Sequence, residues 1–449
     1  MMIKTLRQRN FALLWLGGMI SQTGDWLLII GLPVYVYAQT GSALATSFTL
    51  ISGFIPGILF GSIAGIFADR WNRKWTLIIS NLLLAISLLP LLLVHSKSTL
   101  WIVYIVLFFS SLVEQIVSPA ENALLPSLVS EETLVSANSL ISVSSNASRL
   151  IGAALGGIVL GLLGLSGAVL LDILSFLLVS VLIIFINVPS LSGGLSFVGT
   201  RFSASSGVGR LDSKATKAEP SQNEQRSATA RASWKRFVEE WLEGLRLIYR
   251  QRTLAILLIA FALTGIGEGI FGVLLVVFVK QVLGGDAVVY GSLLAVQAIG
   301  SLAGGLAISQ LGNRLPPLRL AGVGLFCFGV VDLLIVDLPL VVHGLLIVFL
   351  LFILVGLPGT AGLVGLNTSL QLLVEDNLRG RIFASFLASR TALMLVGMVL
   401  AGTLGDRLGS VLMLNAQGGM YVISGLLVLF TLWRVVAGKQ AKAELLASQ

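Results

Sequence analysis

Apolar stretches of about 20 residues recur along nearly the whole chain of 449 residues. An α-helix needs about 20 such residues to cross the hydrocarbon core of a bilayer. Twelve stretches of this kind follow one another, at residues 11–38, 44–67, 75–94, 100–118, 138–162, 168–186, 254–279, 288–311, 320–337, 340–366, 382–405 and 411–433. They predict an all-α membrane protein with twelve transmembrane helices.

The composition argues against other classes of protein. Hydrophobic residues make up 56% of the chain and charged residues only 11%, whereas a water-soluble protein carries about 25% charged residues. Secreted, nucleic-acid-binding and ordinary soluble-enzyme classes therefore do not fit. The single cysteine, Cys327, has no partner for an intrachain disulfide, and two distant histidines, His95 and His343, do not suggest a metal site. We expect no metal, no cofactor and no nucleic-acid partner.

The basic residues are distributed asymmetrically around the apolar stretches. If the N-terminus is cytoplasmic and the sides alternate, 24 of the 29 Lys and Arg residues fall in cytoplasmic segments. The outer loops then hold only Lys97, Lys280 and Arg407. Because basic loops remain in the cytoplasm, we expect a multi-pass protein of the cell membrane with both termini cytoplasmic.

Residues 187–253 interrupt the pattern between the sixth and seventh stretches. Up to about residue 232 they are polar and show no apolar period, which predicts a flexible linker. Over residues 233–250, apolar side chains recur at spacings of three and four among Lys and Arg, namely Trp234, Phe237, Trp241, Leu245 and Ile248. This pattern predicts an amphipathic helix at the cytoplasmic membrane interface. The alternative is a helix that docks on the bundle.

The linker divides the chain into two comparable parts. Residues 1–186 and 254–433 contain six apolar stretches each, and a cytoplasmic tail follows at 434–449. An offset near 240 places Asp25 near Glu268 and superposes Arg149 on Arg390. Parallel repeats with a substrate site between them near the midplane are a transporter architecture. We therefore predict two pseudo-symmetric six-helix bundles.

The loop after the second stretch carries a recognisable motif. It reads Gly65-Ile-Phe-Ala-Asp69-Arg70-Trp71-Asn72-Arg73-Lys74, and it resembles the G-x-x-x-D-R-x-G-R-K signature of the major facilitator superfamily. Asn72 stands where the family usually has Gly, and Asn tolerates the left-handed turn conformation that Gly serves.

The resemblance implies a conformational lock. Asp69 is expected to meet the N-terminus of the eleventh helix, near Arg381, and to hold the cytoplasmic side closed in the outward-open state. The positive end of a helix favours such an anion. Arg70, Arg73 and Lys74 are expected at neighbouring helix ends or lipid headgroups.

A second motif lies in the fifth stretch. Gly152-Ala153-Ala154-Leu155-Gly156-Gly157 is similar to the G-P-x-x-G-G signature of drug antiporters, with Ala153 in place of Pro. Segments 118–129 and 371–383 are similar to cytoplasmic loops in the branch that holds macrolide-type drug exporters, siderophore exporters and lysophospholipid transporters. This resemblance covers nearly the whole chain except the linker.

Ionisable residues inside the spans are the main candidates for function, because a charge in hydrocarbon costs at least ~2.5–3.5 kcal/mol. Asp25 and Glu268 lie midway along the first and seventh stretches and are expected to bear proton coupling. Arg149 is expected to pair with Glu114, because both lie at similar depths from the cytoplasmic turn between them. Asp25 is the alternative partner of Arg149. Arg390 is the fifth residue that we expect at the proton-coupling and substrate cavity.

No enzyme signature accompanies these residues. The chain lacks a phosphate-binding Gly-rich loop with Lys and Ser/Thr, and it lacks a nucleophile elbow between a strand and a helix. We interpret the chain as a proton-coupled exporter of small amphipathic compounds that acts as a monomer in the lipid bilayer. The alternatives are a lipid or lysophospholipid flippase and a non-transporting membrane sensor of the same fold.

Overall fold

The computed structural model describes residues 5–68, 71–187, 241–311, 315–342, 344–374 and 378–447. Within these ranges the chain forms long α-helices joined by short turns, without a strand. The helices are α2 (Arg9–Thr40), α3 (Ala43–Ala68), α4 (Arg73–Leu88), α5 (Trp101–Leu128), α6 (Glu131–Ile184), α8 (Arg252–Gln281), α9 (Ala287–Leu311), α10 (Pro317–Val341), α11 (Leu345–Leu373), α12 (Arg379–Leu408) and α13 (Ser410–Ala447). Two 3-10 turns, η1 (Leu89–Leu93) and η2 (Lys97–Thr99), connect α4 to α5.

Eleven helices of the described part are long and apolar enough to cross a membrane. Of these, α6 contains two crossing segments, because the backbone leaves the helical conformation at Gly164, where φ is +67°. Leu140, before this glycine, accepts a hydrogen bond from Trp15 of α2. Asn187, after the end of α6, accepts one from Asn10 at the start of α2. The chain therefore reverses at Gly164, and the predicted fold class is confirmed.

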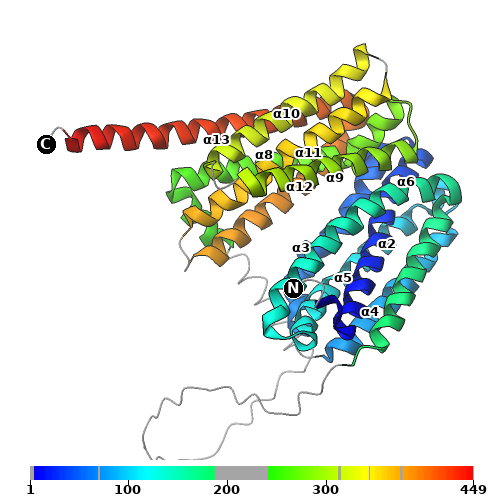
Figure 1. Ribbon diagram of the computed structural model, residues 1–449. Coiled ribbons are helices and arrows are strands. Elements are labelled where there is room, and N and C mark those ends of the chain that lie inside the picture. The colour runs from blue at the N-terminus through cyan, green and yellow to red at the C-terminus, as the bar shows by residue number, and fades with distance from the viewer. Residues whose placement is uncertain are drawn as a thin grey trace, which may run out of the picture.

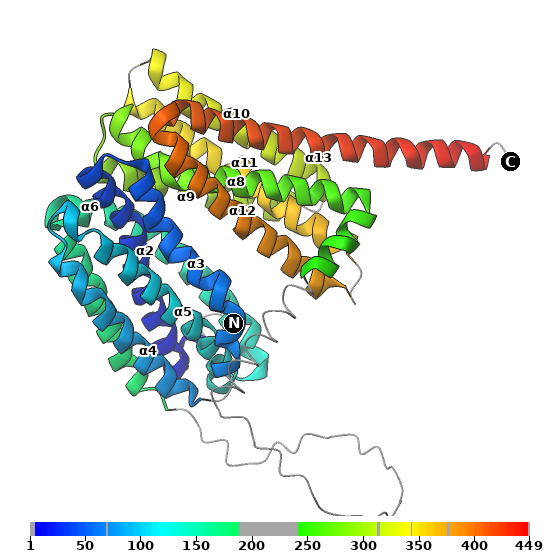
Figure 2. The ribbon, with the colours of Figure 1, turned by 180° about the vertical axis from the view of Figure 1, so that it is seen from behind.

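The crossing segments form two bundles, which Figure 1 shows in blue to green and in green to red. We call α2 to α6 the N-half and α8 to α13 the C-half. The linker end of each bundle is the end at which residue 187 leaves the N-half or residue 241 enters the C-half. The opposite end is the distal end. In both views the halves meet at their distal ends and diverge toward their linker ends (Figures 1 and 2).

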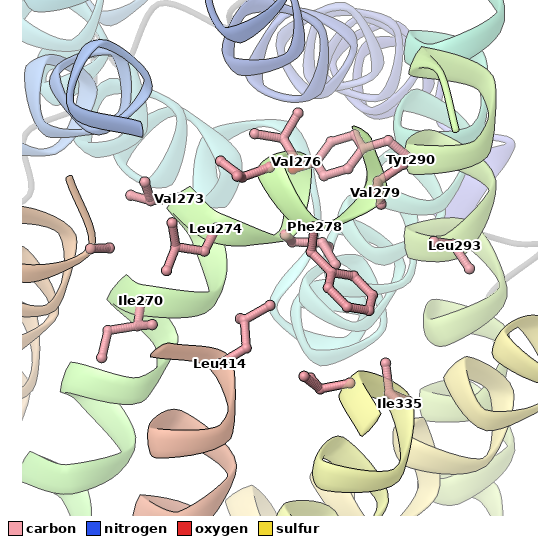
Figure 3. Close-up of a cluster of buried hydrophobic side chains, with 14 of the residues drawn as sticks. Ile270, Val273, Leu274, Val276, Phe278, Val279, Tyr290, Leu293, Ile335 and Leu414 are labelled. Atoms are coloured by element: carbon pink, nitrogen blue, oxygen red, sulfur yellow. The ribbon is translucent and has the colours of Figure 1, made fainter. Parts of the chain in front are cut away.

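One cluster of buried hydrophobic side chains crosses between the halves at the distal end. It joins Ile30, Tyr37 and Ala43 of the N-half to the C-half residues around Leu274 and Phe278. Figure 3 shows its C-half part, where side chains of α8 pack toward α9, α10 and α13. Apolar packing therefore holds the two halves together at this end.

Two helix ends differ from the sequence expectation. Residues 118–129 were expected to form a loop, but α5 continues through them to Leu128 and contains Pro119 and Pro126. Membrane helices tolerate proline because neighbouring groups satisfy the freed carbonyls. The last helix, α13, also continues past residue 433 to Ala447, and residues 434–447 consist largely of good helix formers.

The predicted linker lies mostly outside the described residues, which resume at residue 241. Residues 241–250 are helical and dock on the first turns of α12. The Trp241 indole N–H donates to the Ser389 hydroxyl at 3.2 Å, and Glu243 pairs with Arg381 at 3.2 Å. Ile248 is fully buried in the C-half core. The described end of the predicted amphipathic helix thus packs on the bundle.

Candidate functional site

Three acidic side chains of the N-half line one polar pocket. Asp25 comes from α2, whereas Glu114 and Glu121 come from α5, and the pocket has a volume of about 210 Å³. Glu114 and Glu121 share a face of α5 because they are seven residues apart, which is two helical turns. Glu114 is exposed, while Asp25 and Glu121 are half-buried. The pocket is therefore accessible from outside the bundle.

This pocket gathers acidic side chains without a basic one. Asp25, Glu114 and Glu121 line it, and its lining includes no Lys or Arg in the described part of the chain. Asp172 lies behind the pocket with only 1% of its surface exposed and accepts a hydrogen bond from Ser175. A group of carboxylates without a basic partner attracts positive charge.

The predicted pair of Arg149 and Glu114 is not formed. Arg149 lies instead over the indole ring of Trp26, with 5.0 Å between the guanidinium carbon and the ring centroid. Within the described residues it forms no ion pair with Glu114 or with Asp25, the alternative partner. The helices that carry the two residues are not neighbours, because α6 packs along α2 and makes few contacts with α5. Similar depth in the membrane did not make the two residues neighbours.

The C-half does contain an ion pair at the equivalent place. Arg390 of α12 donates a hydrogen bond to Glu268 of α8. Their side chains are 29% and 45% exposed. Glycines at 265 and 269 allow this approach, because a Cβ on either would collide with the backbone of α12 at Arg390 or Met394. Arg390 is the repeat equivalent of Arg149. The two halves therefore hold equivalent charges in different arrangements.

The signature after α3 is only partly within the described residues. Gly65 belongs to α3, but Asp69 and Arg70 lie outside the described part, so the expected lock stays a prediction. Asn72 does not adopt the left-handed conformation expected for it, because its φ is −66° and its side chain caps α4 by accepting from the Trp75 N–H. Asn at this position acts as a helix N-cap.

The two basic residues that follow Asn72 open α4. Arg73 is its first residue and is exposed. Lys74 donates from Nζ to the carbonyl oxygens of Ile184 and Ile186, both at 2.8 Å. A cation at the carbonyl end of a helix is favourable. Lys74 therefore holds the end of α6, as expected for a basic residue at a neighbouring helix end.

The three glycines of the antiporter-like motif have different neighbours. A Cβ on Gly152 would lie 2.5 Å from the Trp26 Cβ, and one on Gly156 would lie 3.1 Å from the Leu27 carbonyl oxygen. These two glycines therefore pack α6 on α2 within the N-half. Gly157 faces the other half, where a Cβ would collide with the Ala287 carbonyl of α9. Only the last glycine of the motif belongs to the contact between the halves.

Sequence reasoning missed a polar contact between the halves at the distal end. Asp406, near the end of α12, accepts hydrogen bonds from the Ser42 hydroxyl at 2.9 Å and the Ala43 N–H at 2.8 Å. Beside it, the Gln281 side-chain amide donates to the Tyr37 hydroxyl at 2.9 Å. A signal was present in the sequence, because Gly402-Thr-Leu-Gly-Asp406-Arg407-Leu-Gly409 repeats the pattern of the segment from Gly65 to Asn72.

The described residues offer no metal site. Among them, no group of three or more His, Cys, Asp or Glu side chains is arranged to hold a metal ion.

Comparisons with known proteins identify a family model and relatives that match all or part of the chain. A family model described as Major Facilitator Superfamily matches residues 14–263 and 257–447. Macrolide efflux protein A of Streptococcus pyogenes is 24% identical over 408 residues, which are 89% of this chain and 90% of that protein. An uncharacterised transporter of the same superfamily from Bacillus subtilis is 30% identical over 168 residues, or 37% of this chain and 40% of its own length.

Solved structures resemble the fold as a whole. A bacterial homologue of the iron transporter ferroportin, in an inward-facing state, aligns with a TM-score of 0.71 and 16% identity over 94% of this chain and 98% of its own. A POT family transporter in complex with 5-aminolevulinic acid aligns with a TM-score of 0.69 and 14% identity, over 94% of this chain and 96% of its own. At these identities the likeness concerns the fold alone.

Proposed function

Because this chain belongs to the major facilitator superfamily, we propose that it is a proton-coupled exporter of small amphipathic compounds that works by alternating access. The acidic pocket in the N-half carries the proposal. Asp25, Glu114 and Glu121 converge there from two helices, and they can exchange a proton for a positively charged substrate group. The similarity to macrolide efflux protein A over 89% of the chain supports a drug-type substrate.

The linker end is the cytoplasmic end in this proposal. Basic residues gather there at the starts of α4, α8 and α12, whereas the distal end holds Lys97, Lys280 and Arg407. The positive-inside rule then assigns both termini to the cytoplasm. Since the halves meet at the distal end, the described conformation is the inward-open state, in which a substrate reaches the acidic pocket from the cytoplasm.

Protons and substrate compete for the acidic residues. A proton that arrives from outside neutralises a carboxylate of the pocket and displaces a cationic substrate. The return to the inward-open state then releases the proton to the cytoplasm. In the C-half, Glu268 keeps Arg390 as its partner, so its carboxylate is available to a proton or substrate only when that pair opens.

Transport by the purified protein in proteoliposomes tests this function. Dyes, macrolides, siderophores and lysolipids are supplied under an imposed pH gradient. We expect gradient-driven transport of a cationic amphipathic compound, and loss of the dependence on the gradient when Asp25→Asn and Glu268→Gln are combined. Asp286→Asn is the control, because the carboxylate of Asp286 caps α9 within the C-half and does not line the acidic pocket.

Three outcomes would contradict the proposal. Unchanged transport by the combined variant would remove proton coupling from Asp25 and Glu268. Movement of lysolipid that ignores the pH gradient would identify a flippase. Absence of transport for every compound, with the protein folded, would favour a non-transporting sensor.

A further inference from the structure

The distal contact between α3 and α12 is a helix cap supplied by the other half of the protein. The first N–H groups of a helix lack partners inside the helix, and a carboxylate is a preferred cap. At the start of α3, the Ala43 N–H donates to one Asp406 oxygen and the Ser42 hydroxyl donates to the other. The cap comes from a residue more than 360 positions away, so it exists only while the halves touch.

A glycine of α12 allows the close approach of the two helices at this cap. A Cβ on Gly402 would collide with the Ser47 hydroxyl of α3, whereas the tight neighbour of Gly405 is Leu274 of α8, 2.7 Å away within the C-half. After them, Gly409 ends α12 with φ at +84°. Small residues at helix contacts allow close backbone approach. Gly402, which lets α12 approach α3, therefore lies one helical turn before Asp406.

The two helices run antiparallel across the contact between the halves. Gly402 lies against Ser47, whereas Gly405 lies near Ala43, so residue numbers rise along one helix as they fall along the other. With 26 residues, α3 is ~39 Å long. Its C-terminal end is therefore on the linker side. In the sequence, the pattern Gly-x-x-x-Asp-Arg occurs at residues 65–70 and again at residues 402–407.

We propose that Asp406 is a positioning residue of the transport cycle, which holds the distal end closed by capping α3 across the two halves. The cap is present in the described conformation and must break before the distal end can open. This role rests on the proposed alternating access and concerns the distal side only.

The strength of the cap suits a reversible step. Asp406 is exposed, and an exposed charge at a helix end changes an equilibrium by about two- to fivefold. Loss of Asp406 is therefore expected to raise the ratio of distal-open to distal-closed molecules by about two- to fivefold. It should bias the cycle without abolishing it.

Spin-label distances across the distal end test the proposal without substrate or gradient, so the result does not depend on transport. Labels are placed through Lys97→Cys in the N-half and Val341→Cys in the C-half, in a Cys327→Ser background. We expect Asp406→Asn and Asp406→Ala to increase the long-distance population by about two- to fivefold. Asp286→Asn is the matched control, because it removes a helix-capping carboxylate within one half.

A second pair of variants covers the case in which the Asp406 variants do not fold. Gly402→Ala inserts a methyl group between α12 and α3, whereas Gly419→Ala has nothing within 4 Å of the added carbon. Only the first should increase the long-distance population. Unchanged distances in both Asp406→Ala and Gly402→Ala would overturn the proposal, as would an equal shift in Asp286→Asn.

Discussion

Glu268 and Arg390 should be energetically coupled to each other, whereas Arg149 of the N-half should be coupled to neither Asp25 nor Glu114. The perturbation is a double-mutant cycle that combines Glu268→Gln with Arg390→Gln. Each single change leaves one charge without its partner, whereas the double change removes both charges. The interaction energy of the cycle then reports the pair itself.

The exposure of the two side chains sets the expected magnitude. Fully exposed pairs contribute about 0.2–1 kcal/mol, and breaking a buried pair costs about 3–5 kcal/mol. With 45% and 29% of the side chains exposed, we expect a coupling on the order of 1 kcal/mol, at the upper end of the exposed range. The measurement is reversible unfolding of the purified variants in mixed detergent micelles.

The matched cycles combine Arg149→Gln with Asp25→Asn or with Glu114→Gln. Because Arg149 lies over Trp26 and pairs with neither acid, both cycles should be additive within about 0.3–0.5 kcal/mol. A coupling of Arg149 with either acid as large as that of Arg390 with Glu268 would refute the reasoning. The asymmetry between the halves would then not exist in the folded protein.

Three further changes test other contacts. Lys74→Met should lower the free energy of unfolding by about 1 kcal/mol because two bonds to the end of α6 are lost, and an equal loss in Arg73→Met would contradict this. In the same unfolding measurement, Asn72→Ala should destabilise the protein by up to ~1 kcal/mol and Asn72→Gly by only a few tenths. Stabilisation by Asn72→Gly would contradict the capping role and favour a left-handed turn at this position. Gly157→Val should widen the distal spin-label distances because the side chain meets Ala287 of the other half, whereas Gly53→Val, with open space around it, should not.

The fold could be predicted from the sequence because its main signal is local. Each apolar stretch reports its own helix, and the Gly164 turn falls between the stretches ending at 162 and starting at 168. Glu121 was missed for a related reason. Its segment was assigned to a loop by resemblance, and only the continuation of α5 to Leu128 brings it onto the face of Glu114.

Lateral neighbours could not be predicted in the same way. Equal depth suggested that Arg149 meets Glu114, but depth does not say which helices touch or which way a side chain turns. The repeat was the better guide in the C-half, because the equivalents of Asp25 and Arg149 do pair there. Asp406 was predictable from its pattern alone, whereas its partner on α3 depends on how the two halves approach each other.

The hydrophobic cluster shared by the two halves makes the cycle sensitive to temperature. Opening the distal end exposes apolar side chains such as Tyr37 and Val276, which are buried in one cluster when the halves meet. Exposure of apolar surface to water raises the heat capacity, and hydrophobic attraction weakens on cooling. The free-energy difference between the two states should therefore vary non-linearly with temperature. The distal-closed state should lose population as the membrane cools.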